Sequence, residues 1–295
     1  MYAYTPPPLY EKLNAILQHA QKLHPLPASV HRLLHILNQN NTTIGEVAKL
    51  FAADQALTAQ ILQAANAVTL GYTSTCSSVQ EAVMRLGFSR VRAVVLSSAA
   101  KNMLSQQLKG YKLGAGALWE HSVATAQYAR QISKVVNYKD PEEAYVAGLL
   151  HDVGKLMLDQ YVLEDYHKIV QMMKENNISV WQAEEVMFGI DHAQLGGMVA
   201  KKWGLPPILI EAIQHHHLPS FAWHYKELSA IVNIANSFTP KDTTSLAGLD
   251  GRLPNPIAVD ILHLDAYALD QLWKQTTQEL QKEHITQTEV LTPIL

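Results

Sequence analysis

The residues of this sequence best suited to chemistry are histidines in its second half. Each of the following lies at or near the end of a predicted helix: His121, His151, His192, His215, His216 and His217. Asp152 follows His151 directly, and imidazole with carboxylate is a common ligand set for borderline metal ions. A lone His-Asp pair would more simply be a hydrogen-bonded helix end. Because helices of a bundle project such side chains into a shared interior, we expect them to converge in one cavity that holds a metal ion.

The histidines and the cysteine of the first half of the chain suggest no metal or catalytic site. His19, His24, His31 and His35 lie among polar residues, so we expect them to face solvent. Cys76 is the only cysteine, which excludes an intrachain disulfide and fits a reducing compartment.

The elements that must position these residues are helices. Apolar residues recur at three- and four-residue spacing along most of the chain, and no alternating β-branched run predicts a strand. In the first half this periodicity predicts helices over 11–22, 28–39, 44–51, 57–67, 79–87 and 90–104, after an extended proline-containing arm of about ten residues.

The second half has clear helix punctuation. Asp140 before Pro141 predicts a capped helix start, and Asp191 predicts another. We expect Gly154 to end the first of these helices in the left-handed conformation, and Gly204 to end the second. Further helices are predicted over 119–136, 207–217 and 225–238, with a final one from 258 or 265 to about 282.

A glycine-bearing break at 109–116 separates two strongly periodic regions. We therefore predict an all-α protein of two docked helical lobes, a small N-terminal bundle over 1–112 and a second helical bundle with a C-terminal helical tail over 113–295.

Composition excludes several classes of function. The 295 residues carry 23 basic and 26 acidic side chains, a net charge of −3, which argues against a protein that coats nucleic acid. The segment 42–68 is similar to a DNA-binding helix-turn-helix, but Lys49 is its only basic residue. Because a recognition helix needs basic side chains to contact phosphates, we expect no DNA or RNA binding. No signal peptide and no run of 18 apolar residues is present, so we expect a cytoplasmic protein without a membrane partner.

Several motifs resemble a known family in order and spacing. WEHSVATAQYAR, AGLLHDVGKL, DHAQLGGMVAKKWGLPP and AIQHHHLP are similar to the motifs of the HD superfamily of metal-dependent phosphohydrolases. The first half is similar to the family named HDOD, for HD-related output domain. Its characteristic positions correspond to Leu26, Pro27, Asp54, Leu57, Thr58, Leu62, Asn66, Ala82, Leu86 and Gly87. The resemblance covers roughly residues 20–240 and implies an HD-like bundle for the second lobe.

The resemblance also assigns roles to individual residues. It implies a metal site made of His121, His151, Asp152, His192, His216 and His217, with His215 as an additional histidine. Lys155 takes the position in which catalytic relatives place a lysine near the scissile phosphate, so it is the expected catalytic residue only if the protein is an enzyme.

Two positions depart from the catalytic pattern. Superfamily enzymes close the metal site with an aspartate on a later helix, where this chain has Asn236, and an amide oxygen is a neutral, weaker ligand. Relatives that cut cyclic di-GMP place a glutamate where this chain has Ala117, and their Gly-Tyr-Pro element is missing from LPSFAWHYK. The cyclic-dinucleotide phosphodiesterase hypothesis is therefore a poor one.

Two functions of different classes follow. The HDOD resemblance implies a bacterial signalling module without robust catalysis, whose partner is a signalling protein or a nucleotide-like ligand. The alternative is a metal-dependent phosphohydrolase acting on a nucleotide or phosphate ester. In both cases the imidazole-rich site favours a divalent transition metal such as Fe, Zn, Ni or Mn over magnesium.

Overall fold

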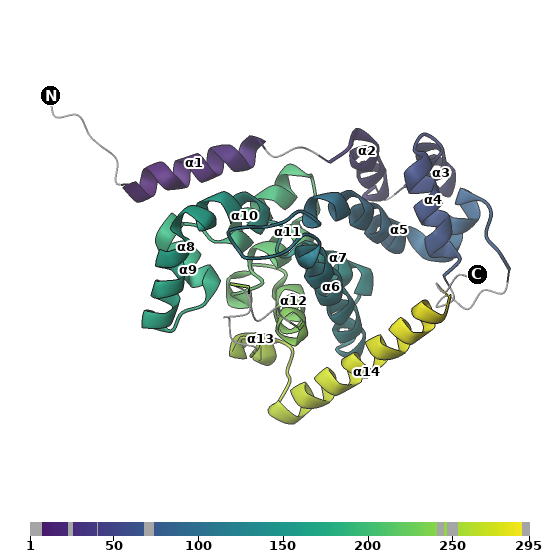
Figure 1. The fold of residues 1–295 in the computed structure, drawn as a ribbon. Helices are drawn as coiled ribbons and strands as arrows, with labels where there is room; N and C mark the ends of the chain where they lie inside the picture. Colours follow the sequence, from purple (N-terminus) through teal and green to yellow (C-terminus); the bar gives the residue numbers. More distant parts are fainter. Residues whose placement is uncertain are drawn as a thin grey trace.

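The computed structural model describes residues 8–22, 26–39, 41–67, 74–240, 245–246 and 253–290. These residues form helices throughout, and among them no strand occurs, only an isolated antiparallel bridge between Leu108 and Leu113. The predicted all-α class is confirmed. The helices, shown in Figure 1, are α1 (Pro8–Lys22), α2 (Ala28–Leu37), α3 (Ile44–Phe51), α4 (Gln55–Ala65), α5 (Val79–Leu104), α6 (Ala117–Val135), α7 (Pro141–Leu150), α8 (Lys155–Asn176), α9 (Val180–Phe188), α10 (His192–Lys202), α11 (Pro207–Gln214), α12 (Lys226–Phe238), α13 (Pro256–Ile261) and α14 (Ala266–Val290).

The first-half helices α2, α3 and α4 pack on α5. The apolar stripe of α2 is buried as its spacing predicts, through Val30, Leu33, Leu34 and Leu37. Helix α5 is broken at Gly87, whose φ of 72° is readily adopted only without a Cβ. The predicted separation of two helices at this glycine is confirmed.

The second-half helices are organised around α6 and α7. Gly148 of α7 lies against the backbone of α6, because a Cβ on it would approach Ala126 Cα to 2.9 Å. Helix α12 packs on both, and α10 packs on α11. The predicted caps are present, since Asp140 accepts hydrogen bonds from the first turn of α7 and Asp191 from that of α10. Gly204 has the expected positive φ of 70°.

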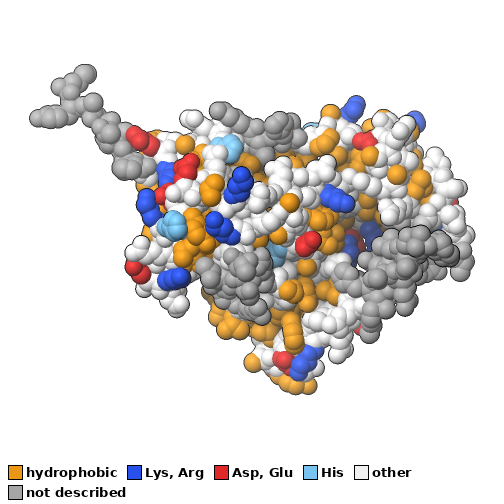
Figure 2. Space-filling model, in the orientation of Figure 1, with side chains coloured by type: hydrophobic (Ala, Val, Ile, Leu, Met, Phe, Trp, Pro, Cys, Tyr) orange, Lys and Arg blue, Asp and Glu red, His pale blue; other side chains and the backbone are white. Residues whose placement is uncertain are grey.

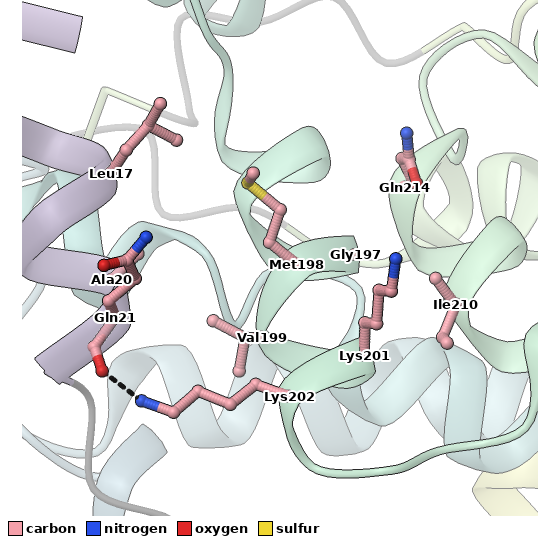
Figure 3. A pocket seen from close by; sticks show the side chains of 10 residues that line it. All are labelled: Leu17, Ala20, Gln21, Gly197, Met198, Val199, Lys201, Lys202, Ile210 and Gln214. Atoms are coloured by element: carbon pink, nitrogen blue, oxygen red, sulfur yellow. Dashed lines mark hydrogen bonds between the residues drawn. The ribbon is translucent and has the colours of Figure 1, made fainter. Parts of the chain in front are cut away.

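The N-terminal helix α1 lies on α8, α9 and α10, away from α2 to α5 (Figure 1). Lys12 of α1 forms an ion pair with Asp165 of α8. Between α1 and the α10–α11 pair runs a groove lined by Leu17, Met198 and Ile210, closed at one end where Lys202 Nζ donates to Gln21 O (Figure 3).

The buried apolar side chains form one continuous cluster that includes residues of both halves. The division into lobes over 1–112 and 113–295 therefore stays a prediction. No helix among the described residues is long and apolar enough to cross a membrane. On the described part of the face in Figure 2, Lys and Arg side chains are spread among acidic and apolar ones and form no continuous basic stripe.

Several expected boundaries are wrong. Gly154 has a right-handed φ of −65° and precedes α8, so it does not end α7 in the left-handed conformation. Helix α11 ends at Gln214 instead of residue 217, which leaves His215, His216 and His217 beyond it. The C-terminal region contains two helices, α13 and α14, separated at His263, whose φ is 54°. Helix α1 begins at Pro8, inside the stretch predicted to be an extended arm, and residues 1–7 of that stretch lie outside the described residues.

Candidate metal centre

The six residues expected to hold a metal lie together, and each comes from the end of a helix or the turn beside it. His121 is in the first turns of α6, and His151 with Asp152 follows α7 directly. His192 is the first residue of α10, while His216 and His217 follow α11. We call these six residues the histidine cluster.

Asp152 stands at the middle of the histidine cluster. Its Oδ2 lies 3.5 Å from His121 Nε2 and 3.3 Å from His151 Nε2. Its Oδ1 lies 3.2 Å from His192 Nε2. His217 Nε2 is in turn 2.9 Å from His192 Nε2. The donors fall into two groups, each with its ligand atoms within 4.8 Å of one another: His121, His151 and Asp152, and His192, His216 and His217.

Two buried nitrogen atoms of the histidine cluster, His151 Nε2 and His216 Nε2, have no hydrogen-bond partner, and Asp152 Oδ1 has only the 3.2 Å contact with His192 Nε2. Both imidazoles donate from Nδ1 to the carbonyl three residues earlier, at 2.7 Å to Gly148 O and 2.8 Å to Ile213 O. In the neutral form of each ring, Nε2 is therefore the atom that carries the lone pair. Leaving such groups unsatisfied costs about 1–3 kcal/mol each, and a cation between them would satisfy all three. The donor set thus fits a divalent transition metal.

The histidine cluster contains one carboxylate and a neighbouring ammonium. Lys155 Nζ lies 2.6 Å from Asp152 Oδ2, and both side chains are buried. Burial by itself would raise the pKa of Asp152, but the adjacent His151 and Lys155 lower it well below its usual range. Asp152 is therefore ionised at neutral pH and available as a ligand.

The histidines differ in protonation. Burial lowers the pKa of both His216 and His217 well below the ordinary value, so these rings are neutral and able to coordinate. For His192, burial acts in the same direction, but the carboxylate of Glu184 outweighs it and raises the pKa to about 10. Binding of a cation at His192 would therefore release a proton.

Side chains of helix α9 contact two histidines of the histidine cluster, His192 and His217. Glu184 Oε2 accepts from His192 Nδ1 at 2.6 Å and from His192 N at 2.9 Å. Glu184 Oε1 accepts from Tyr111 Oη at 2.7 Å, and burial next to this carboxylate raises the pKa of Tyr111 well above its ordinary value. Trp181 stacks on His217, with ring centroids 5.3 Å apart and planes at 12°. These contacts fix both ring orientations, as outer-shell partners of metal ligands do.

Sequence reasoning missed Glu184, Tyr111 and Trp181. Helix α9 was not among the predicted helices, and Tyr111 lies 73 residues from Glu184, so no local pattern connects them. The one available signal was Glu184 itself, a glutamate among the apolar residues of α9, because glutamate is uncommon at buried positions.

Gly154 has a different role from the predicted one. A Cβ at this position would overlap the carbonyl oxygen of His192 and approach Gly196 N to 2.7 Å. The absence of a side chain therefore lets the turn that carries His151 and Asp152 touch the start of α10.

The two departures from the catalytic pattern lie on helices of the same bundle. Asn236 is on α12, and its Oδ1 is buried without a hydrogen-bond partner. Ala117 is the first residue of α6. That Asn236 occupies the position of a missing ligand stays a prediction.

A cavity of about 370 Å³ opens beside the histidine cluster. His121, Asp152 and Lys155 line it together with Glu120 and Thr239. A small molecule in this cavity would meet one edge of the histidine cluster, because the side chain of His121 is 16% exposed whereas that of Asp152 is 1% exposed.

Comparisons with known proteins identify relatives of this chain. A protein of Treponema pallidum (strain Nichols), itself uncharacterized, is 26% identical over 259 residues, which is 87% of this chain and 48% of that protein. The chain thus spans about half the length of this relative. The solved structure of an HDOD domain protein of unknown function from Geobacter sulfurreducens matches with a TM-score of 0.67 and 25% identity, over 97% of this chain and 100% of that one.

A structure from Shewanella amazonensis SB2B, whose name proposes a phosphohydrolase, matches with a TM-score of 0.65 and 23% identity, over 90% of this chain and 93% of that one. At that identity the likeness shows the fold alone. The HDOD domain model matches residues 23–219, which is two thirds of the chain and includes all six residues of the histidine cluster. The chain belongs to the HDOD domain family.

Proposed function

We propose that this protein is a regulatory module of bacterial signal transduction in which the histidine cluster holds a divalent transition metal as a structural or sensory group. Its partner is a signalling protein or a nucleotide-like ligand. The observation that carries the proposal is the closure of the donor set. Two groups of three donors adjoin at the 3.2 Å contact between His192 Nε2 and Asp152 Oδ1, and the side chains of His151, Asp152 and His192 are at most 2% exposed. Structural metal sites are closed in this way, whereas catalytic ones keep an open position.

Lys155 and Asn236 support the same proposal. The Lys155 ammonium neutralises Asp152, the only carboxylate among the six donors. An asparagine in place of a second carboxylate adds no negative charge, so the site would hold a divalent cation less tightly than one with two carboxylates.

The experiment is metal analysis of protein purified without chelator or affinity-tag metal. We expect bound iron, zinc, nickel or manganese in the wild type, its loss in the double variant His151→Ala, Asp152→Ala, and hydrolysis of bis(p-nitrophenyl) phosphate at background in both. His31→Ala, at an exposed histidine of α2, is the matched control and should retain the metal. Full metal stoichiometry in the double variant would overturn the site assignment.

The alternative, a metal-dependent phosphohydrolase, is favoured by one observation, the cavity beside His121, Asp152 and Lys155. A divalent ion bound there would supply Lewis acidity toward a phosphate oxygen. Lys155 would donate to a second phosphate oxygen. Hydrolysis above background that disappears in Asp152→Ala would replace the signalling proposal with this one.

A further inference from the structure

A second cavity, of about 340 Å³, lies between helices α4 and α5 on one side and α6 and α7 on the other. It is separate from the histidine cluster and shares no lining residue with it. We call it the cationic pocket and define it by the residues that the argument uses: Gln60, Arg90, Lys101, Trp119, Arg130 and Tyr145.

The cationic pocket has a strong excess of positive charge. Arg90, Lys101 and Arg130 line it, and no Asp or Glu is among the described residues that do. Glu142 is the acidic group in contact with them, with Oε2 at 2.7 Å from Arg130 Nη2 and Oε1 at 3.9 Å from Arg90 Nε. Three cations against one carboxylate leave a net positive site in a chain whose net charge is −3. Such a site attracts anions.

Arg130 is held in a fixed orientation. Its guanidinium lies over the ring of Tyr145, with Cζ 3.9 Å from the ring centroid, while Glu142 binds one end of it. A guanidinium fixed on two sides loses little freedom when it binds a third group, and its planar fork matches phosphate and carboxylate.

Two residues that line the cationic pocket each have a buried polar atom without a hydrogen-bond partner, Arg130 Nε and Gln60 Oε1. The first is a donor and requires an acceptor, such as an anionic oxygen. The second is an acceptor and requires a donor, such as a hydroxyl or amino group. One molecule that offers both an anion and a neutral donor would satisfy the pair.

We propose that the cationic pocket binds a small phosphorylated molecule with a planar ring, of the class and size of a nucleoside monophosphate. Arg90, Lys101 and Arg130 bind the phosphate, the indole of Trp119 offers a stacking surface for the ring, and Gln60 accepts from a hydroxyl or amino group. The volume lies within the usual range of small-molecule sites, which form at the junctions between packed units.

This inference deepens the proposed signalling function, because it gives the nucleotide-like ligand a site, but it does not depend on metal in the histidine cluster. Trp119 and His121 are two residues apart on the first turns of α6, so their side chains point to opposite sides of the helix. The two sites therefore lie on opposite sides of one helix turn.

The test is isothermal titration calorimetry of the full chain with AMP, GMP and inorganic phosphate as probes. We expect saturable binding of at least one nucleotide, tighter than that of phosphate. Lys101→Glu and Arg90→Gln should each raise the dissociation constant for the nucleotide at least about tenfold, because the charge that meets the phosphate is reversed or removed. Lys174→Glu, the same charge change at an exposed residue of α8, should leave it within about twofold.

Two outcomes overturn the inference. One is the absence of any heat with all three probes at millimolar concentration. The other is equal weakening by Lys101→Glu and Lys174→Glu, which would indicate nonspecific attraction. Equal affinity for phosphate and nucleotide would remove the planar ring from the proposal. The variant His151→Ala, Asp152→Ala separates this inference from the metal proposal, because it should lose metal and still bind the nucleotide.

Discussion

The histidine cluster and the cationic pocket both contain buried polar atoms without partners, but the two sites are built differently. In the histidine cluster, short side chains at helix ends form two adjoining groups of donors, and Glu184 and Trp181 fix two of the rings. In the cationic pocket, long side chains from four helices line an open cavity, and Glu142 forms ion pairs with two of them, Arg90 and Arg130. Short, fixed donors suit an ion of defined coordination, whereas long cationic ones suit an anion of variable shape.

The largest expected difference between the two sites is in the stability lost when one carboxylate is removed at each. In chelator-treated protein, Asp152→Ala leaves the ammonium of Lys155 buried without its counter-charge, and we expect a loss of about 3–5 kcal/mol in the free energy of unfolding. Glu142→Ala removes a carboxylate that is 16% exposed, and we expect a loss of about 1 kcal/mol. Urea denaturation with both midpoint and slope measures each value.

A second variant keeps this prediction testable if Asp152→Ala fails to fold. In the double variant Asp152→Ala, Lys155→Met the buried ammonium is gone, and we expect part of the lost stability to return. Equal losses for Asp152→Ala and Glu142→Ala would contradict the difference in burial on which the comparison rests.

The next largest effect concerns the support of the histidine cluster by α9. Glu184→Ala frees His192 Nδ1, so the ring no longer has a fixed orientation, and we expect metal affinity to fall about 10–100-fold. Glu184→Gln keeps one acceptor oxygen and should lose less. The matched control is Glu185→Ala, at the exposed neighbour, which should leave affinity unchanged. Competition with a chromogenic chelator measures all three, and equal affinity of Glu184→Ala and Glu185→Ala would remove Glu184 from the site.

How much of this could be predicted from the sequence depends on the range of the contacts. Asp140 and Asp191 cap helices through bonds to residues two or three positions away, so their roles can be read locally. The break at Gly87 is local for the same reason. The family motifs then supplied the set of side chains that meet at Asp152.

The contacts that the sequence did not reveal are non-local. Tyr111 reaches Glu184 across 73 positions, and Gly154 is required by the backbone of α10 instead of by its own φ. A glycine needed for close approach and one needed for a left-handed turn have the same letter, and only the packed structure distinguishes them. The cationic pocket is likewise assembled from four helices whose charges are unremarkable in sequence.

A smaller effect is expected from salt. Ions screen charges near the surface more than buried ones, and the Debye length falls from about 10 Å at 0.1 M to about 3 Å at 1 M. We therefore expect AMP binding at the cationic pocket to weaken several-fold between these concentrations of potassium chloride. Metal content should stay constant, because four of the six donors of the histidine cluster are buried and the other two are only partly exposed. Salt-independent AMP binding would place the phosphate away from Arg90 and Lys101.

The smallest expected effect tests whether Asn236 occupies the predicted position of a missing ligand. Asn236→Asp adds a carboxylate on α12 where an amide oxygen is buried without a partner. If that position is next to the metal, we expect metal affinity to rise a few-fold, because a carboxylate is a stronger ligand than an amide. The same competition assay measures it. Ser237→Asp is the control, since it adds the same charge one residue along the helix, where the side chain is turned by about 100°.

The two variants together separate charge from position. If both tighten metal binding equally, the gain is a general effect of negative charge on α12, and Asn236 has no special place. If neither does, the alignment of α12 with the catalytic relatives is wrong, and the partnerless Oδ1 of Asn236 has another cause. A gain confined to Asn236→Asp would mean that the missing carboxylate limits metal affinity. If hydrolysis then still stays at background, the missing carboxylate does not by itself account for the lack of phosphohydrolase activity.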